Sequence, residues 1–248
     1  MNHIGFGIMC FGDSMYFRGT TEKIDNLTVR GYNCYVLTDN RDFFVEKYWG
    51  KSVKILSYDR SFKSYHDKIH LVKQIHKDHQ IAILIDADTN ITDYDVFRRL
   101  EIFEYQEGIS YVDTLSNHKS KFDKIGKIPM EGDEWKQYEN YCLKKYKDFK
   151  DLDTVWEYFI VFNRLGFRSK PFFYEYEKLQ IIKESCDIPF EKGVSGAGEG
   201  ISISIASQLS GNKIQKDSRL ATLTNNSIKP ITRYTPSNQR PDFMKNDK

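Results

Sequence analysis

The chain has 248 residues, of which 40% are hydrophobic and 29% are charged. The presence of 16 Tyr, 17 Phe and 3 Trp excludes a disordered chain, and 15 Gly with only 6 Pro exclude collagen-like and low-complexity sequences. A chain of this length and composition is typical of one large domain with a sizeable core.

Charge is distributed unevenly along the chain, although the formal net charge is only +2 and predicts no nucleic-acid partner. Residues 211–248 hold eight Lys or Arg against three Asp, a net charge of +5, which leaves −3 for the first 210 residues. We predict a globular domain over 1–222 and a polar, basic tail over 223–248. A basic tail is typical of a solvated chain end, or of one that contacts phosphate groups.

The sequence also indicates a cellular compartment. No apolar run approaches the roughly 20 residues that a membrane-spanning helix needs. The four cysteines are scattered and form no CxxC pair, which favours reduced thiols over a zinc site. We therefore expect a cytoplasmic protein without a membrane span.

The first 90 residues alternate between apolar runs of strand length and segments of helix length. We expect strands at 4–11, 32–38, 53–56 and 81–85, and helices from Thr20 or Thr21 to Arg30 and from Tyr65 to His79. This β-α-β-β-α-β order predicts an α/β fold with a mixed, mostly parallel sheet flanked by helices.

The patterns in the rest of the chain are weaker. We expect helices at 94–106 and 134–147, a strand at 158–162, a small-residue loop at 193–200, a helix at 201–209 and a loop beyond 222.

The apolar run at 81–85 ends in Asp86-Ala87-Asp88. Like charges oppose each other's ionisation, so two carboxylates this close favour a bound cation. Mn²⁺ or Mg²⁺ takes oxygen ligands, often one or two carboxylates together with substrate phosphates. Because ligands of open α/β sheets bind outside the carboxyl ends of the strands, the pair predicts a metal and diphosphate site. Two solvated turn carboxylates would give the same pattern.

The segment from Ile81 to Ile91, IAILIDADTNI, resembles the D-x-D segment of GT-A glycosyltransferases, especially the glycogenin-like and galactosyltransferase-like retaining families. In those enzymes the two aspartates bind the metal that bridges the diphosphate of a nucleotide sugar. The resemblance implies a GT-A-like, Rossmann-like fold, and it assigns Asp86 and Asp88 to the metal and the nucleotide sugar. It extends over the preceding ~80 residues in the order of the elements, not in identity.

The same resemblance implies further donor contacts. The turn after the first strand is similar to the family's nucleotide-binding turn, so Tyr16 would stack on the base. Asp39, at the end of the second strand, would contact the nucleoside, and Lys68 or Lys73 would face the donor. From the residues alone, Tyr16 equally fits a packed side chain, Asp39 an Asx turn, and the lysines a solvated helix face.

One feature departs from the family pattern. Many metal-dependent members use a C-terminal His as a third metal ligand, whereas the last histidine here is His118. The third ligand is therefore of another type or absent. The basic C-terminal segment offers Lys213, Lys216 or Arg219 as partners of the diphosphate instead.

Sugar transfer also needs a group beside the reacting sugar or the acceptor hydroxyl. Glu199 stands among glycines that permit a ligand to approach closely, and Glu157 precedes a buried strand among aromatic residues. We predict both as candidate catalytic residues. The first turn of a helix would explain Glu199 equally well, and an exposed strand edge would explain Glu157.

The resemblance thus predicts a metal-dependent hexosyltransferase that moves a sugar from a nucleotide sugar, uridine diphosphate-linked, to an unidentified acceptor, and it favours a retaining over an inverting reaction. A protein, a glycan, a small molecule and a modified nucleic acid are all open as acceptors. Two alternatives remain: a nucleotidyltransferase acting on sugar phosphates, and a non-catalytic nucleotide- or glycan-binding module. A haloacid-dehalogenase-like phosphatase is disfavoured because Asn90 stands where its motif requires Thr.

Overall fold

The structure is a computed structural model that describes residues 3–12, 14–57, 65–117, 140, 144, 152–185 and 199–230. The elements follow one another in this order: β1 (Ile4–Cys10), α1 (Ser14–Val29), β2 (Asn33–Thr38), α2 (Arg41–Tyr48), β3 (Val53–Ser57), the 3-10 helix η1 (Tyr65–Ile69), α3 (His70–Asp78), β4 (Ile81–Asp86), β5 (Asn90–Ile91), α4 (Val96–Glu101), β6 (Gly108–Tyr111), β7 (Thr114–Asn117), β8 (Asp153–Val155), β9 (Phe159–Asn163), α7 (Ser169–Ser185), α8 (Glu199–Leu209), β10 (Ile214–Lys216), α9 (Ser218–Thr224) and β11 (Ile228–Lys229).

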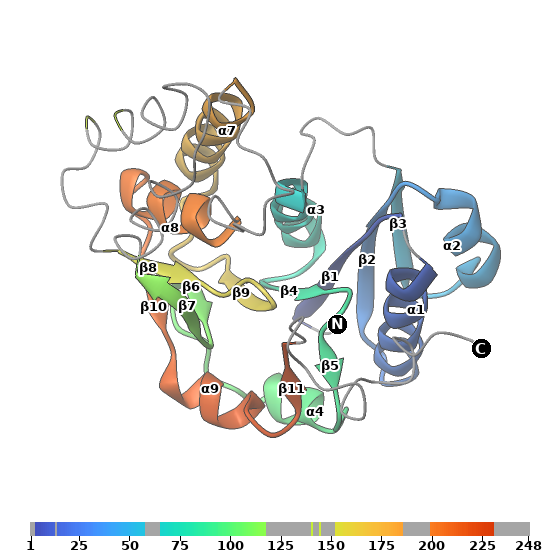
Figure 1. The fold of residues 1–248 in the computed structure, drawn as a ribbon. Coiled ribbons are helices and arrows are strands. Elements are labelled where there is room, and N and C mark those ends of the chain that lie inside the picture. The colour runs from blue at the N-terminus through green and yellow to red at the C-terminus, as the bar shows by residue number, and fades with distance from the viewer. Residues whose placement is uncertain are drawn as a thin grey trace.

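A seven-stranded sheet in the order β10-β6-β9-β4-β1-β2-β3 forms the centre of the fold (Figure 1). Strand β9 runs antiparallel to its neighbours β4 and β6, and the other pairs are parallel. This confirms the predicted α/β class with a mixed, mostly parallel sheet. The chain moves outward from β1 to β3 and then returns to place β4 on the other side of β1. The boundary between β1 and β4 is therefore a topological switch point, where α/β proteins bind ligands.

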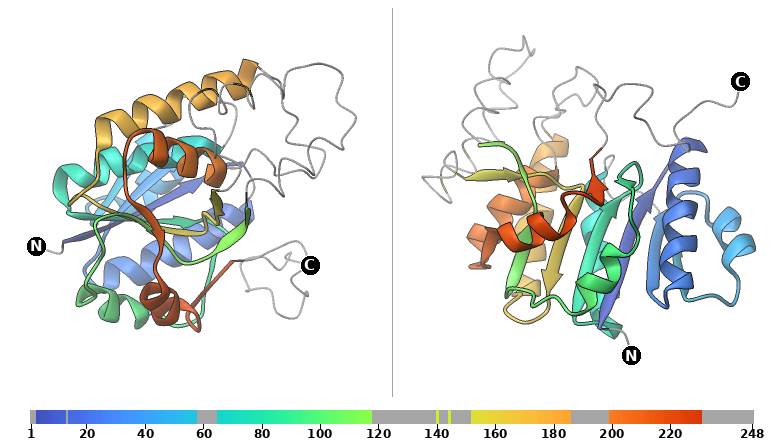
Figure 2. Two further views of the ribbon diagram at one scale, coloured as in Figure 1. Left: turned by 90° about the vertical axis from the view of Figure 1, so that its left-hand side faces the viewer. Right: turned by 90° about the horizontal axis from the view of Figure 1, so that it is seen from below.

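Helices cover both faces of the sheet, which gives three layers in Figure 2. The core on one face includes buried side chains of α3, α7 and α8, and the core on the other includes those of α1, α2, α4 and α9. Strand β4 is apolar from Ile81 to Ile85 because it is buried between the two layers.

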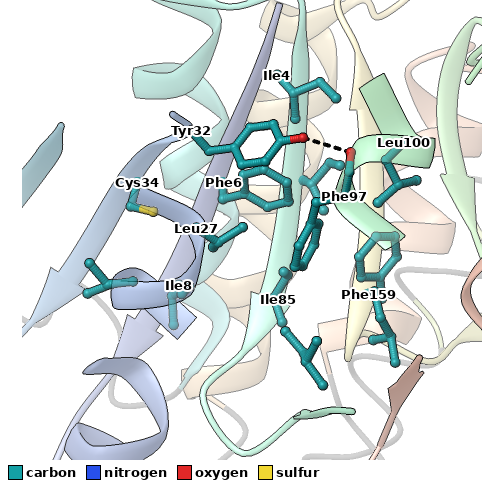
Figure 3. Close-up of a cluster of buried hydrophobic side chains, with 14 of the residues drawn as sticks. Ile4, Phe6, Ile8, Leu27, Tyr32, Cys34, Ile85, Phe97, Leu100 and Phe159 are labelled. Atoms are coloured by element: carbon teal, nitrogen blue, oxygen red, sulfur yellow. Dashed lines mark hydrogen bonds between the residues drawn. The ribbon is translucent and has the colours of Figure 1, made fainter. Parts of the chain in front are cut away.

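Strand β1 presents large apolar side chains to one face of the sheet and glycines to the other. Its residues Ile4, Phe6 and Ile8 pack beneath α1 and α4, where the Tyr32 hydroxyl donates to the Phe97 carbonyl at 2.7 Å (Figure 3). The intervening Gly5 and Gly7 face α3. A Cβ added to Gly5 would lie 2.6 Å from Ile75 Cγ2, and one added to Gly7 would lie 2.6 Å from Leu84 Cδ2. The glycines therefore let α3 approach β1 closely.

The first helix begins earlier than predicted. Helix α1 starts at Ser14, so Thr20 and Thr21 lie within it rather than at its N-cap. The Thr21 hydroxyl donates to the Arg18 carbonyl at 2.8 Å, a bond back into the preceding turn. Tyr16 consequently lies in the first turn of a helix and not in the expected loop.

Other elements also differ from the expectation. Helix α2 was expected as a connection, and the Asn40 side chain caps it by accepting from Phe43 N at 3.4 Å. The helix expected over 94–106 is confined to α4, and strand β6 follows it. The helix expected over 134–147 lies outside the described residues except for 140 and 144, as does the loop at 193–200 except for its last two residues.

The chain continues to contribute to the fold beyond residue 222. That predicted boundary falls within α9, and Ile228 of β11 is 1% exposed in the core beside α4. In the part of the chain that the structure describes, no helix has both the length and the hydropathy needed to cross a bilayer.

Candidate active site

The aspartate pair lies at the carboxyl end of β4, at the switch point between β4 and β1. Asp86 is the last residue of β4 and pairs in register with Met9 of β1. Its carbonyl accepts from Thr89 N at 3.1 Å, which closes a turn around Ala87 and Asp88. The Asp86 side chain is 29% exposed and Asp88 is half-buried, so both carboxylates are near solvent at the ligand-binding edge.

The neighbouring strand end holds this turn in place. The Tyr158 carbonyl accepts from Asp86 N at 3.2 Å and from the Thr89 hydroxyl at 3.3 Å, so one carbonyl anchors both ends of the turn. Ala87 is 6% exposed and belongs to the core on the α1 side. A small apolar residue between the aspartates therefore packs inward while the carboxylates stay near the surface.

Lys68 binds the first aspartate directly. It lies in η1 with its side chain 3% exposed, and its ammonium group donates to Asp86 Oδ1 and, at 3.0 Å, to the Glu157 carbonyl. Lys73, the other lysine considered, is exposed and pairs with Glu177 at 3.1 Å. The structure thus brings Lys68, and not Lys73, to the aspartate pair.

A second lysine, which the sequence interpretation missed, supports the turn from the opposite side. Lys23 of α1 is 1% exposed, and its ammonium group donates to the Ala87 carbonyl at 2.7 Å and to the Gly19 carbonyl at 3.2 Å. The signal was its spacing: Lys23 stands three residues after Thr20 and four before Leu27, on the buried face of the helix.

The pair lies in a field that favours an added cation. Burial, followed by the Asp86 charge, raises the pKa of Asp88 to about 6, while Lys23 and Lys68 act in the opposite direction. Burial lowers the pKa of Lys23 to about 8, against the attraction of Glu22 and both aspartates. The two lysines therefore compensate the carboxylates only in part.

The donor set fits a hard divalent cation shared with a phosphorylated ligand. Among the described residues no cluster of three or more His, Cys, Asp or Glu side chains is placed to hold a metal. Asp86 and Asp88 would supply carboxylate oxygens, and phosphates and water would supply the rest, as is common for Mg²⁺.

The two candidate nucleoside contacts lie at the same edge of the sheet. Asp39 follows β2 directly, is exposed, and accepts a hydrogen bond from Gly12 N at 3.4 Å through Oδ1. Tyr16, in the first turn of α1, is half-buried and packs against the core on that side. Both therefore border the carboxyl end of β1, next to β4.

The start of α8 holds one candidate catalytic glutamate and bonds the other. Glu157 Oε1 accepts from Gly200 N at 3.3 Å, and a Cβ on Gly200 would collide with the Val155 carbonyl. Glu199 is the first residue of α8, and its side chain lies outside what the structure describes. Because the Glu157 carbonyl also binds Lys68, one residue connects the helix start to the aspartate pair.

The structure does not bring Lys213 to this site. Its carbonyl accepts from Ile109 N at 2.9 Å, next to Gly108 at the beginning of β6. Gly108 pairs with Asn163, which pairs with Ile81 at the start of β4, so Lys213 is level with the opposite end of the strand from the aspartates. Lys216, at the other end of β10, lies toward the carboxyl end of the sheet, where the aspartates are. Its ammonium group pairs with Asp113 at 2.9 Å.

The chain matches no protein-family profile and no curated protein. Several solved glycosyltransferases resemble it in structure. The WbbM bifunctional glycosyltransferase is 15% identical, with 71% of this chain and 34% of that chain covered and a TM-score of 0.42. The mannosyltransferase PcManGT from Pyrobaculum calidifontis, in complex with GDP-Man and Mn²⁺, is 8% identical, with coverages of 87% and 54% and a TM-score of 0.42.

The galactosyltransferase LgtC, in complex with donor and acceptor sugar analogs, is 11% identical, with 84% of this chain and 72% of that chain covered and a TM-score of 0.48. The chain thus spans only part of the length of WbbM and PcManGT.

Proposed function

We propose that this protein is a metal-dependent glycosyltransferase that moves a sugar from a nucleotide sugar, uridine diphosphate-linked, to an acceptor hydroxyl. The observation that carries the proposal is the position of Asp86 and Asp88 at the switch point of the sheet, with a buried lysine on each side. Metal, diphosphate and nucleoside can all be held from this one edge.

In this proposal Asp86 and Asp88 would hold Mn²⁺ or Mg²⁺, and the bound ion would supply positive charge to the diphosphate leaving group. Tyr16 stacks on the base and Asp39 contacts the nucleoside. The Lys68 ammonium group adds positive charge beside the diphosphate, and its bond to the Glu157 carbonyl keeps it in place.

The acceptor side is assigned to the start of α8. We place Glu199 next to the transferred sugar, where in a retaining reaction a carboxylate stabilises the oxocarbenium-like state. Glu157 is the second candidate, and its side chain and carbonyl contribute through Gly200 and Lys68.

Substitution of one aspartate tests the metal site. In Asp88→Asn we expect the Mn²⁺-dependent part of UDP binding, measured by titration calorimetry with Mn²⁺ or with EDTA, to fall at least about tenfold, because a neutral amide is a weaker metal ligand. Asp95→Asn, which removes an exposed carboxylate paired with Arg30, should leave binding unchanged. Full Mn²⁺-dependent binding by Asp88→Asn would overturn the proposal.

Turnover of the donor separates an enzyme from a binding module. A glycosyltransferase is expected to release UDP slowly from its own UDP-sugar when Mn²⁺ is present. Binding without release indicates a non-catalytic module. Release of pyrophosphate from a nucleoside triphosphate and a sugar phosphate indicates a nucleotidyltransferase.

A further inference from the structure

Helix α1 carries a buried ammonium group whose acceptors are unusual for a lysine beside two carboxylates. Lys23 donates at 2.7 Å to the carbonyl of Ala87, the residue between the two aspartates, and at 3.2 Å to the Gly19 carbonyl of its own helix. Burying an ammonium group is costly unless it is hydrogen-bonded and charge-compensated. Its presence behind the turn therefore needs an explanation that packing alone does not give.

We propose that Lys23 is a positioning residue, which fixes the Asp86–Ala87–Asp88 turn to helix α1 through the Ala87 carbonyl and so keeps both carboxylates directed toward the ligand. This inference rests on the proposed function, because it assumes that the turn binds a metal. It adds to that function a residue that lies outside the metal and donor contacts already assigned.

Within this turn the Lys23 ammonium group donates to a backbone carbonyl and not to a carboxylate. A lysine bound to a carboxylate oxygen competes with a metal for that oxygen, as Lys68 does at Asp86. A bond to the intervening carbonyl places positive charge close to both aspartates and leaves their oxygens available. Both aspartates attract the Lys23 ammonium group electrostatically, so its positive charge lies within electrostatic range of the two carboxylates.

The same helix connects the turn to the proposed nucleoside contact. Tyr16 and Lys23 are seven residues apart on α1, two helical turns, and so share one face. If α1 holds both the base-stacking residue and the metal-binding turn, metal and nucleotide binding are expected to strengthen each other. Such coupling is reciprocal and can be measured as a ratio of affinities.

Hydrogen exchange tests the positioning without metal or nucleotide. The Thr89 amide donates to the Asp86 carbonyl within the turn, whereas Ile83 is buried in the middle of β4. In Lys23→Met we expect the Thr89 amide to exchange at least about tenfold faster and the Ile83 amide to keep its rate. Unchanged exchange at Thr89, or an equal increase at both amides, would refute the proposal.

Mn²⁺ binding provides the second readout. For Lys23→Met we expect about tenfold weaker binding of Mn²⁺ alone, followed by electron paramagnetic resonance, and a smaller ratio of UDP affinities with and without Mn²⁺. UDP affinity in EDTA should stay at the wild-type value, which general loss of structure would not allow. Lys77→Met removes an exposed lysine of α3 that bonds Gln74 and is the control. Wild-type Mn²⁺ affinity in Lys23→Met would contradict the inference.

The two proposals fail in different ways. If the wild-type protein binds no Mn²⁺, the proposed function is wrong, while Thr89 exchange still decides whether Lys23 positions the turn. If Lys23→Met does not fold, Lys23→Gln is used instead. Its amide reaches one bond less far, so faster Thr89 exchange and weaker Mn²⁺ binding are again expected, and wild-type values for both would overturn the proposal.

Discussion

Asp86 and Asp88 have different surroundings although a single alanine separates them. Asp86 is paired with Lys68, whereas burial and the Asp86 charge raise the pKa of Asp88 to about 6. The first aspartate is thus held by the protein, and the second is the one that gains most from an added cation. For the proposed metal site we therefore propose unequal parts, with Asp86 as an oriented ligand and Asp88 as the stronger attractor of the metal.

The position of Lys68 beside the aspartate pair leads to a prediction for Lys68→Met. In the proposed site the Lys68 ammonium group lies beside the diphosphate, and loss of a charge-assisted hydrogen bond to a phosphate oxygen is worth about 1.5–3 kcal/mol, so we expect UDP affinity in the presence of Mn²⁺ to fall about tenfold or more. Titration calorimetry measures the change. Lys73→Met, which disrupts an exposed pair with Glu177, should bind as the wild type does. Equal losses in the two variants would mean that net charge, and not the position of the Lys68 ammonium group beside the diphosphate, determines affinity.

A kinetic test distinguishes a catalytic role of Glu199 from a role in donor binding. We expect Glu199→Gln to lose sugar transfer by at least about a hundredfold while keeping UDP affinity, because a group acting on the transferring sugar contributes mainly in the transition state. Rates of UDP release with Mn²⁺ and calorimetry on the same sample give both quantities. A variant with unchanged turnover would return Glu199 to a helix-terminal role.

At the scale of elements, the contact of α3 with β1 depends on two glycines. Strand β1 offers Ile4, Phe6 and Ile8 to the α1 face, whereas Gly5 and Gly7 offer no side chain to α3, so the helix lies close to the backbone there. A Cβ at Gly7 would lie 2.6 Å from Leu84 Cδ2, 3.1 Å from Ile75 Cδ1 and 3.2 Å from Leu71 Cβ. The first of these neighbours can rotate away, whereas the Cβ of Leu71 moves only with its helix.

We expect Gly7→Ala to destabilise the protein by about 1–3 kcal/mol, the usual cost of overpacking a core. Urea unfolding followed by circular dichroism measures this loss. Val29→Ala, at a residue that is 84% exposed at the end of α1, should change the free energy of unfolding by less than about 0.5 kcal/mol. A neutral Gly7→Ala would show that α3 does not need the close approach.

The same elements show what the sequence could predict. The run at 81–85 is apolar at every position because β4 is buried on both faces, so the strand and the aspartates at its end were recognisable. Helix α1 was placed too late because Thr20 and Thr21 are good N-cap residues, but in the structure both lie inside the helix.

Other parts had no local signal. The strand β10 has only three residues, and its place at the sheet edge depends on pairing with β6, more than 100 residues earlier. The position of Lys213 follows from that pairing and was not predictable from its charge. Lys23 was overlooked because a lysine on a helix is usually solvated, whereas a carbonyl 64 residues away accepts its hydrogen bond.

At the scale of the whole molecule, the order of the strands assembles the site. Strands β1, β2 and β4 end at one edge, so residues near positions 16, 39 and 86 come together although the chain separates them. The antiparallel β9 then brings Tyr158, just before its start, beside the end of β4, where its carbonyl holds the turn. Both layers of helices contribute a lysine, Lys23 from α1 on one face and Lys68 from the segment preceding α3 on the other.

The layer on the α3 side also makes global stability depend on pH. Burial, and then the charge of Lys73, lowers the pKa of His70 to about 4, against the attraction of Glu177, and Asp67 lies 3.6 Å from the ring. Burial also lowers the pKa of His76, whose ring bonds the Phe162 carbonyl. In the unfolded chain both rings have a pKa near about 6.5.

Below about pH 6.5 the unfolded chain therefore binds protons that the native state rejects, and the free energy of unfolding falls as the pH is lowered toward about 4. We expect a lower urea midpoint at pH 5 than at pH 7.5. The raised pKa of Asp88 acts in the opposite direction, so the comparison with a variant isolates the histidines. In the double variant His70→Gln and His76→Gln the difference between the two pH values should shrink, and a difference as large as in the wild type would assign the pH dependence to other groups.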